Sequence, residues 1–403
     1  MAEATVAIDT AALVRWRRAI MAAFVLAGVT VAALGPRLPA VKAELGIGTA
    51  TIGLLVAGAT VGGIAGLLIS TPVLRRFGSR GGVTLSLLAV AAAMAAMGVA
   101  VPLRCVPLLS AALVVSGLGI GTLDVLVNAQ GSAIERAAGR SFMPRLHGSW
   151  SVGITLGSGI SAACAALGVT PAVQFMGEAA LVVAGAVVGA PAIPIGGSPA
   201  TAGRPSQTRS AKLCAWLRGW TDRRLLLIGV VMFGVDLGEG SANNWLTLAV
   251  KDDHGQTAAV AALFFSAFAI GEALARIFGG PVVDRLGRCN TIRCTTALGV
   301  VGLLLFILGD NRWTVLAGVV FWAVGVSMGF PLGMSAAAES GPGPAERVRV
   351  AASVGYFASL AGPPAIGVLA DAVGLLHALW LIVALFAVAF TAAGSLGRRP
   401  SGR

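Results

Sequence analysis

Four acidic residues lie inside long apolar stretches of the chain: Asp124, Asp236, Glu239 and Glu272. An ionisable side chain at membrane depth is costly and usually marks a functional site. A carboxylate that binds a proton on one side and releases it on the other carries that proton across. We therefore predict proton coupling through Asp124, Glu239 and Asp236. The alternative for each acid is a hydrogen bond to a neighbouring helix.

Amides and glycines accompany these acids at helical spacing. Asp124 shares a stripe with Gly117, Gly121 and Asn128, at steps of three and four residues. We expect the glycines to open space and the polar groups to face a cavity. A similar stripe runs from Asp236 to Asn243. The predicted solute-binding residues are Asn128, Asn243, Asn244, Trp245 and Arg37. Arg37 either holds an anionic solute or reaches the outer surface.

Two further groups suggest gating. Glu272 and Arg276 stand four residues apart, a spacing at which opposite charges pair on a helix. We expect Arg276 to be structural or gating, with Glu272 as its partner. His147 follows Pro144 and Arg145. We favour a helix-end contact at the cytoplasmic gate over a pH sensor for this histidine.

Other chemistry has little support in the sequence. The five cysteines form no CxxC pair, and no two histidines have metal-ligand spacing. The chain has no GxxxxGK[ST] loop, and no nucleophile–base pair stands out. We therefore expect no metal, no cofactor and no enzymatic activity. A non-transporting receptor or scaffold is a further alternative, but no extramembrane domain favours it.

Composition defines the class of protein. The chain is 57% hydrophobic and 11% charged over 403 residues, and its mean hydropathy is +0.88. A soluble fold averages about 25% charged residues. The continuous apolar runs exceed the roughly 10-residue alternating strands of a membrane barrel. We predict an all-α membrane protein with twelve spans, near 18–38, 49–71, 82–102, 106–130, 147–168, 172–195, 225–248, 257–279, 294–309, 313–335, 350–370 and 374–396.

The net charge of +12 follows from membrane orientation. Most Lys and Arg residues fall in alternate inter-span segments, including both ends of the chain. The positive-inside rule then places both termini in the cytoplasm, with no need for a nucleic-acid partner. A basic, Gly/Ser/Pro-rich stretch divides the spans six and six. We expect an N-terminal bundle over 1–195, a cytoplasmic linker over 196–224 and a C-terminal bundle over 225–403.

The two halves repeat each other. TPVLRRFG at 71–78 aligns with GPVVDRLG at 280–287, and GLGIG at 117–121 aligns with GVSMG at 325–329. A duplicated six-helix unit is a transporter architecture with its site at mid-membrane.

GPVVDRLGR at 280–288 resembles the signature loop of the major facilitator superfamily. Further stretches, including 117–153, EGSANNW at 239–245 and 355–371, resemble its bacterial inner-membrane branch near fucose permease, the YbjJ-like group. The resemblance implies gating roles for Asp284, Arg285 and Arg288. The first-half loop departs from the family pattern, with Arg75 where an Asp is usual.

Together these observations predict a monomeric secondary transporter in the bacterial inner membrane. It would move a small organic solute by alternating access, with protons as the coupling ion and the lipid bilayer as its surroundings. The alternative is a proton-antiport efflux pump for amphipathic compounds.

Overall fold

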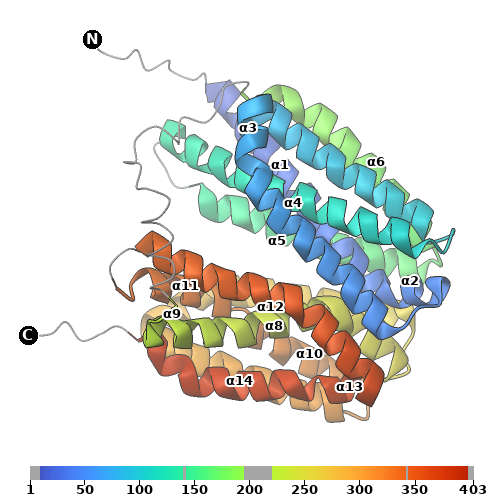
Figure 1. Ribbon diagram of the computed structural model, residues 1–403, viewed down its shortest axis with the longest axis vertical. Coiled ribbons are helices and arrows are strands. Elements are labelled where there is room, and N and C mark those ends of the chain that lie inside the picture. Colours follow the sequence, from blue (N-terminus) through green and yellow to red (C-terminus); the bar gives the residue numbers. More distant parts are fainter. Residues whose placement is uncertain (1–9, 139–141, 195–219, 342–343, 398–403) are drawn as a thin grey trace, which may run out of the picture. The chain divides into compact units, whose positions relative to one another are not determined.

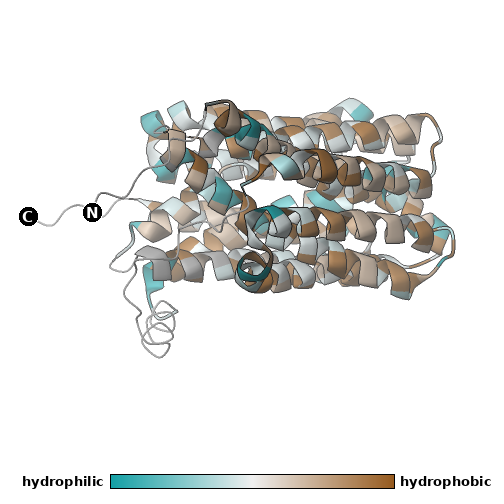
Figure 2. Ribbon diagram, turned by 90° about the horizontal axis from the view of Figure 1, so that it is seen from above, coloured by the Kyte–Doolittle hydropathy of each residue, from teal (hydrophilic) through white to brown (hydrophobic). Residues whose placement is uncertain are grey.

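The computed structural model describes residues 10–138, 142–194, 220–341 and 344–397. Each element in these ranges is a helix (Figure 1). Hydrophobic residues run along the helix bodies (Figure 2), as expected for segments that cross a bilayer. The linker expected over 196–224 lies mostly outside the described residues.

In the described part of the first half, the structure has six α-helices and two short 3-10 helices. They are α1 (Thr10–Leu34), η1 (Gly35–Arg37), α2 (Leu38–Leu45), α3 (Thr49–Ala100), α4 (Val106–Ala138), α5 (Met143–Ala166), α6 (Pro171–Gly189) and η2 (Ala190–Ala192). The second half contains α8 (Arg223–Asp252), α9 (Ala258–Leu308), α10 (Arg312–Val326), α11 (Gly329–Ala338), α12 (Pro344–Val373), α13 (Leu375–Ala378), α14 (Trp380–Ala392) and η3 (Ala393–Leu396).

The two longest helices each combine two of the expected spans. α3 turns at Gly78, where φ is 66°, and α9 turns at Gly287, where φ is 74°. Positive φ is accessible to glycine at little cost. The two glycines occupy matching places in TPVLRRFG and GPVVDRLG, so the structure confirms the internal repeat at the level of the backbone.

The expected twelve spans account for the described helices. Within the described residues, nine stretches are long and apolar enough to cross a membrane. Two of these, α3 and α9, contain a pair of spans each, and α5 supplies the predicted fifth span. One difference is a break in the expected span 313–335, which the structure divides into α10 and α11 around Ser327 and Met328.

The chain forms two compact units. Unit 1 contains residues 1–34 and 58–204, and unit 2 contains residues 35–57 and 205–403. The segment from Gly35 to Ala57 thus belongs to unit 2, although it lies in the first half of the sequence.

Within unit 1, glycines bring helix backbones together. A Cβ on Gly153 of α5 would lie 2.2 Å from the carbonyl oxygen of Val25, and one on Gly157 would lie 2.4 Å from that of Val29. The small residues of α5 therefore allow close backbone packing against α1. The expectation that Gly117 and Gly121 open a cavity is wrong. A Cβ on either residue would lie within 2.2 Å of a carbonyl oxygen of α3, so these glycines admit a neighbouring backbone.

Within unit 2, α8 contacts α9, α11, α12 and α14. Its buried residues include Ile228, Val235 and Trp245. The acids of α8 are therefore carried by a helix with neighbours on several sides, which fixes their positions.

Candidate functional site

The strongest polar cluster lies on α8 and α9 of unit 2. The Nη2 atom of Arg276 is 2.8 Å from Oε2 of Glu239 and 2.6 Å from Oε1 of Glu272. Glu272 is buried, with 8% of its surface exposed. One guanidinium nitrogen therefore holds two carboxylates from different helices, and the two acids are near neighbours. The predicted Glu272–Arg276 pair is confirmed, and Glu239 joins it.

The break between α10 and α11 adds a third contact to Arg276. Its Nε atom donates a hydrogen bond to the carbonyl oxygen of Ser327 at 3.1 Å. Ser327 follows the last residue of α10, where helix carbonyls lack an intrahelical partner. Arg276 thus links α8, α9 and the α10–α11 break through a single side chain.

Asp236 lies one turn before Glu239 on α8. Its Oδ2 atom is buried and has no hydrogen-bond partner within the described ranges. Gly355 of α12 stands against it, since a Cβ there would lie 2.7 Å from Oδ2. Asp236 also interacts electrostatically with Glu239 and Arg276. The cluster therefore combines three carboxyl groups with one guanidinium.

This imbalance defines what the cluster can do. If all three acids were ionised, two negative charges would remain uncompensated among packed helices. Two carboxylates sharing a site in low dielectric do not both ionise cheaply. Binding of at least one proton is the simplest way to reduce this excess, so the arrangement suits proton uptake and release.

The candidate acid of unit 1 has simpler surroundings. Asp124 accepts a hydrogen bond from Nδ2 of Asn128 at 3.0 Å, and the same Nδ2 is 2.9 Å from the backbone oxygen of Asp124. His147, at the start of α5, interacts electrostatically with Asp124. The His147 ring also meets Phe24 of α1 edge-on, with centroids 5.8 Å apart. His147 therefore joins α5 to α1 and lies near a titratable group.

The remaining predicted solute-binding residues differ in access. Asn243 is exposed, and Asn244 donates a hydrogen bond to the carbonyl oxygen of Gly240. Trp245 is fully buried beside Gly367 of α12. Arg37 is buried in η1, with 4% of its surface exposed. In this conformation Asn243 and Asn244 can meet a solute, whereas Trp245 and Arg37 are buried.

Arg288 of the signature loop forms a bidentate ion pair with Glu339. Nη1 and Nη2 of Arg288 lie 2.9 and 2.6 Å from the two carboxylate oxygens of Glu339. Asp284 and Arg285 are exposed and make no hydrogen bond or ion pair with any residue that the structure describes. The resemblance pointed to Arg288, but sequence analysis missed Glu339, which directly follows α11.

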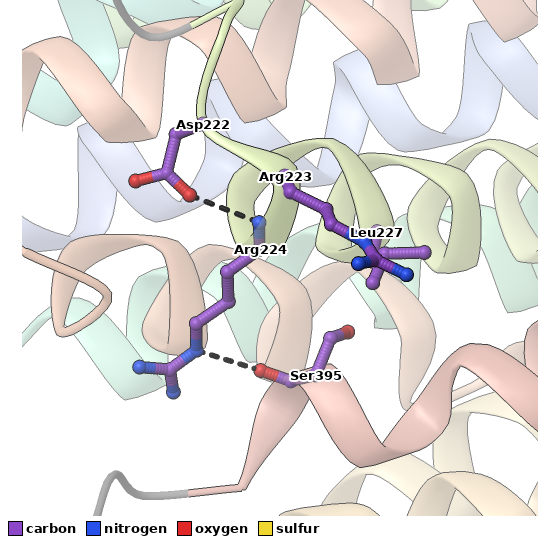
Figure 3. A pocket seen from close by; sticks show the side chains of 5 residues that line it. All are labelled: Asp222, Arg223, Arg224, Leu227 and Ser395. Carbon is purple, nitrogen blue, oxygen red and sulfur yellow. Dashed lines mark hydrogen bonds between the residues drawn. The ribbon is translucent and has the colours of Figure 1, made fainter.

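A pocket of about 430 Å³ opens at the start of α8, lined by Asp222, Arg223, Arg224, Leu227 and Ser395 (Figure 3). Arg224 donates a hydrogen bond to the backbone oxygen of Ser395. Asp222 precedes Glu239 by 17 residues, or about 25 Å along a helix. The pocket is thus separate from the acid cluster.

Asp222 is the central side chain of this helix start. It caps α8 by accepting hydrogen bonds from the backbone N–H groups of Arg224 and Leu225, and it pairs with Arg347 at 2.5 Å. Partial burial acts to raise the pKa of Asp222. The bonds from Arg347 and the helix backbone outweigh burial and lower the pKa from its ordinary value of 3.8. Sequence analysis missed this acid because it lies at the edge of an apolar run.

Comparisons with known proteins agree with this architecture. A family model described as Major Facilitator Superfamily matches residues 228–403. An MFS-type transporter of Yersinia pestis is 29% identical to this chain, over 92% of the chain and 94% of the relative. Transporter y4wD of Sinorhizobium fredii is 30% identical, over 93% of the chain and 96% of the relative.

Solved structures share the fold at low sequence identity. A nucleoside transporter, NupG, is similar with a TM-score of 0.79 at 13% identity, covering 96% of this chain and all of that chain. A D-xylose-proton symporter is similar with a TM-score of 0.70 at 14% identity, covering 95% and 97%. The duplicated helices, the signature loop and the full-length relatives lead to one conclusion: this chain is a multi-pass membrane transporter that belongs to the major facilitator superfamily.

Proposed function

We propose that this transporter couples the movement of a small polar organic solute to a proton gradient through the cluster of Glu239, Glu272 and Arg276. The observation that carries the proposal is the shared guanidinium nitrogen, within 3 Å of both carboxylates. The D-xylose-proton symporter and the nucleoside transporter among its structural neighbours support a polar solute.

The cluster converts a protonation into a change of helix contacts. A proton on Glu239 removes one of the two charges that Arg276 balances. At an effective dielectric of about 20, two unit charges 4 Å apart interact by about 4 kcal/mol. Loss of that attraction releases Arg276 toward Glu272 and weakens the link between α8 and α9. Asp236, one turn away, is a second acceptor for the proton.

Asp124 serves as the acid of the other half. Its hydrogen bond with Asn128 ties a titratable group to an amide that can also bind a solute. Asn243 and Asn244 offer similar amides near the acid cluster. Protonation and solute binding would then compete for, or cooperate through, the same polar groups. Arg285, Arg288 and Asp284 would control closure on the cytoplasmic side.

The two six-helix halves, over 1–195 and 225–403, would rock against each other around this site. The positive-inside rule supports cytoplasmic termini and a cytoplasmic linker. The bacterial sources of the similar transporters support a location in the bacterial inner membrane. A monomer suffices for this mechanism because each chain contains both halves.

Transport in proteoliposomes with an imposed pH gradient tests the proposal. Labelled sugars, nucleosides and polyols would be screened first for accumulation against their gradients. Glu239→Gln, Glu272→Gln and Asp124→Asn would then be compared in two assays, gradient-driven accumulation and solute exchange. Asp310→Asn, in an outer loop, is the matched control.

Neutralising the coupling acid should abolish accumulation but leave exchange, because exchange need not move a proton. Full accumulation in both Glu239→Gln and Glu272→Gln would refute coupling through the cluster. Proton-driven extrusion of amphipathic compounds, without accumulation of polar solutes, would instead indicate the efflux pump.

A further inference from the structure

The N-terminus of α3 is capped by a side chain from the opposite end of the sequence. The backbone N–H groups of Thr49 and Ala50 donate hydrogen bonds to Oδ1 and Oδ2 of Asp371, each at 3.1 Å. The first N–H groups of a helix lack intrahelical partners, and a carboxylate there also interacts favourably with the helix dipole. Asp371 lies near the end of α12 and satisfies two of these groups.

This cap is one of several contacts within unit 2 between the segment 35–57 and helices of the second half. We call this line of contacts the seam. The hydroxyl of Thr247 on α8 donates to the carbonyl oxygen of Gly35 at 2.6 Å. Lys42 of α2 lies 3.5 Å from Asp252. Each contact joins the segment 35–57, from the first half of the sequence, to helices of the second half.

The rest of the seam is close backbone packing. A Cβ on Gly53 of α3 would lie 2.5 Å from the carbonyl oxygen of Pro363, and one on Gly367 would lie 2.9 Å from that of Thr49. These two glycines bring the backbones of α3 and α12 close together, where no side chain can interlock. The directional contacts of Asp371, Thr247 and Lys42 add to this packing.

The segment 35–57 is connected to unit 1 at both of its ends, so it must respond to motion of that unit. Residues 1–34 and 58–204 belong to unit 1, whereas the segment 35–57 between them belongs to unit 2. Any motion of one half relative to the other must bend or detach this segment. If it detaches, water can replace Asp371 at the N–H groups of Thr49 and Ala50, because they lie at a helix end. The cap can thus break reversibly.

We infer that Asp371 is a positioning residue for transport, which holds the segment 35–57 against the second-half helices of unit 2. This inference rests on the proposed alternating access. Release of the cap is the step that lets this segment leave those helices. Asp371 need not contact the solute, and its effect is on the equilibrium between closed and open states.

The test measures opening without relying on transport. Its background is a variant with all five native cysteines replaced: Cys105, Cys164, Cys214, Cys289 and Cys294. Ile52, which is 1% exposed in α3, is then changed to Cys as a reporter. Its rate of maleimide labelling in detergent reports how often the seam opens. Asp371→Ala removes the cap, Asp371→Asn keeps an acceptor without the charge, and Asp310→Ala is the control.

We expect Asp371→Ala to raise the labelling rate about fivefold. Loss of a helix cap typically costs about 1 kcal/mol, which corresponds to a factor of about five in an equilibrium constant. Asp371→Asn should raise it less, and Asp310→Ala should leave it unchanged. Size-exclusion profiles and thermal melting identify any variant that is merely misfolded, and the Asn variant keeps the comparison usable if the Ala variant is lost.

Equal labelling in the parent, Asp371→Asn and Asp371→Ala proteins would overturn the inference, as would the same increase in Asp310→Ala. The proposed function is assessed separately by the proteoliposome assays. Faster labelling in a protein that transports nothing would support the role of Asp371 and refute the transport proposal. Unchanged labelling in an active transporter would refute the role of Asp371 alone.

Discussion

The two halves connect the loops that follow their second spans to their fourth spans by different chemistry. In unit 1, Gln130 donates a hydrogen bond to Ser79 at 2.9 Å and accepts one from Trp16 at 3.1 Å. The residues 209 positions later are Arg288 and Glu339, which form the bidentate ion pair of unit 2. The first connection is neutral and buried, whereas the Glu339 side chain is 46% exposed.

Duplication has therefore preserved the position of this link but not its chemistry. Both loops also keep a positive-φ glycine, at Gly78 and Gly287. The acids at membrane depth differ in the same way. Asp124 is bonded to an amide on its own helix, whereas Glu239 and Glu272 share a guanidinium. Backbone geometry follows the repeat, and the charges distinguish the two halves.

The largest expected effect is the loss of the shared cation. Arg276→Ala leaves Glu239 and Glu272 side by side without a counter-charge. Breaking a buried pair in this way typically costs 3–5 kcal/mol, and the partial exposure of Arg276 reduces our expectation to about 3 kcal/mol. Asp124→Asn should cost less than about 1 kcal/mol because its partner is neutral. Chemical denaturation in detergent measures both, and equal losses would remove the contrast between the halves.

We expect the buried hydrogen bonds of Gln130 in unit 1 to contribute more to the free energy of unfolding than the Arg288–Glu339 ion pair of unit 2. Gln130→Leu keeps the approximate volume but removes the acceptor of the buried Trp16 N–H group. An unsatisfied buried donor costs roughly 2 kcal/mol. The same denaturation measurement applies, with no dependence on salt expected. A loss below that of Glu339→Gln would show that burial does not decide the difference.

Lowering the pH should destabilise unit 2, because Asp222 becomes protonated. The residues 209 positions before Asp222 and Arg347 are Leu13 and Ala138, so unit 1 lacks this pair. Because folding lowers the pKa of Asp222 below 3.8, its stabilisation is present above that pH and is lost as pH falls through the folded value. Asp222→Asn keeps a capping side chain and should cost about 1 kcal/mol at pH 7.

Melting temperatures of the parent and Asp222→Asn proteins between pH 7 and pH 3 check this sign. The difference should shrink below about pH 4. A difference that grows on acidification would contradict the assigned ion pair.

The smallest effect is expected at the charged link itself. Glu339→Gln should cost about 0.5 kcal/mol, because an exposed ion pair gains little over its hydrated groups. Added salt should remove most of the difference, since charges are screened within about 3 Å at 1 M ionic strength. Melting curves at low and high salt test this, and a salt-independent loss would indicate a structural role for Glu339.

The repeat and the long apolar runs predicted most of the fold. Continuous hydrophobic stretches must form helices in a bilayer because backbone groups have no water to bond. The pattern around 71–78 and 280–287 located both loop turns. It did not predict the break at Ser327 and Met328, since the apolar run continues through it.

The candidate site was predictable only in part. The depth of Asp124, Asp236, Glu239 and Glu272 in apolar runs marked them as costly, and the four-residue spacing predicted the Glu272–Arg276 pair. Glu339 and Asp371 sit at helix ends, where an acidic residue is ordinary. Trp245 and Arg37 were predicted to bind solute but are buried.

The sequence by itself determined the class of protein, the number of membrane helices, the duplication and the presence of acids at membrane depth. Each of these depends on composition or on local spacing, which a single chain displays directly. Only the tertiary structure decided which groups meet. Glu239 reaches Arg276 across 37 residues, and Asp371 reaches Thr49 across 322. Such contacts depend on how helices pack, and helix packing depends on surface shape that spacing along one helix does not record.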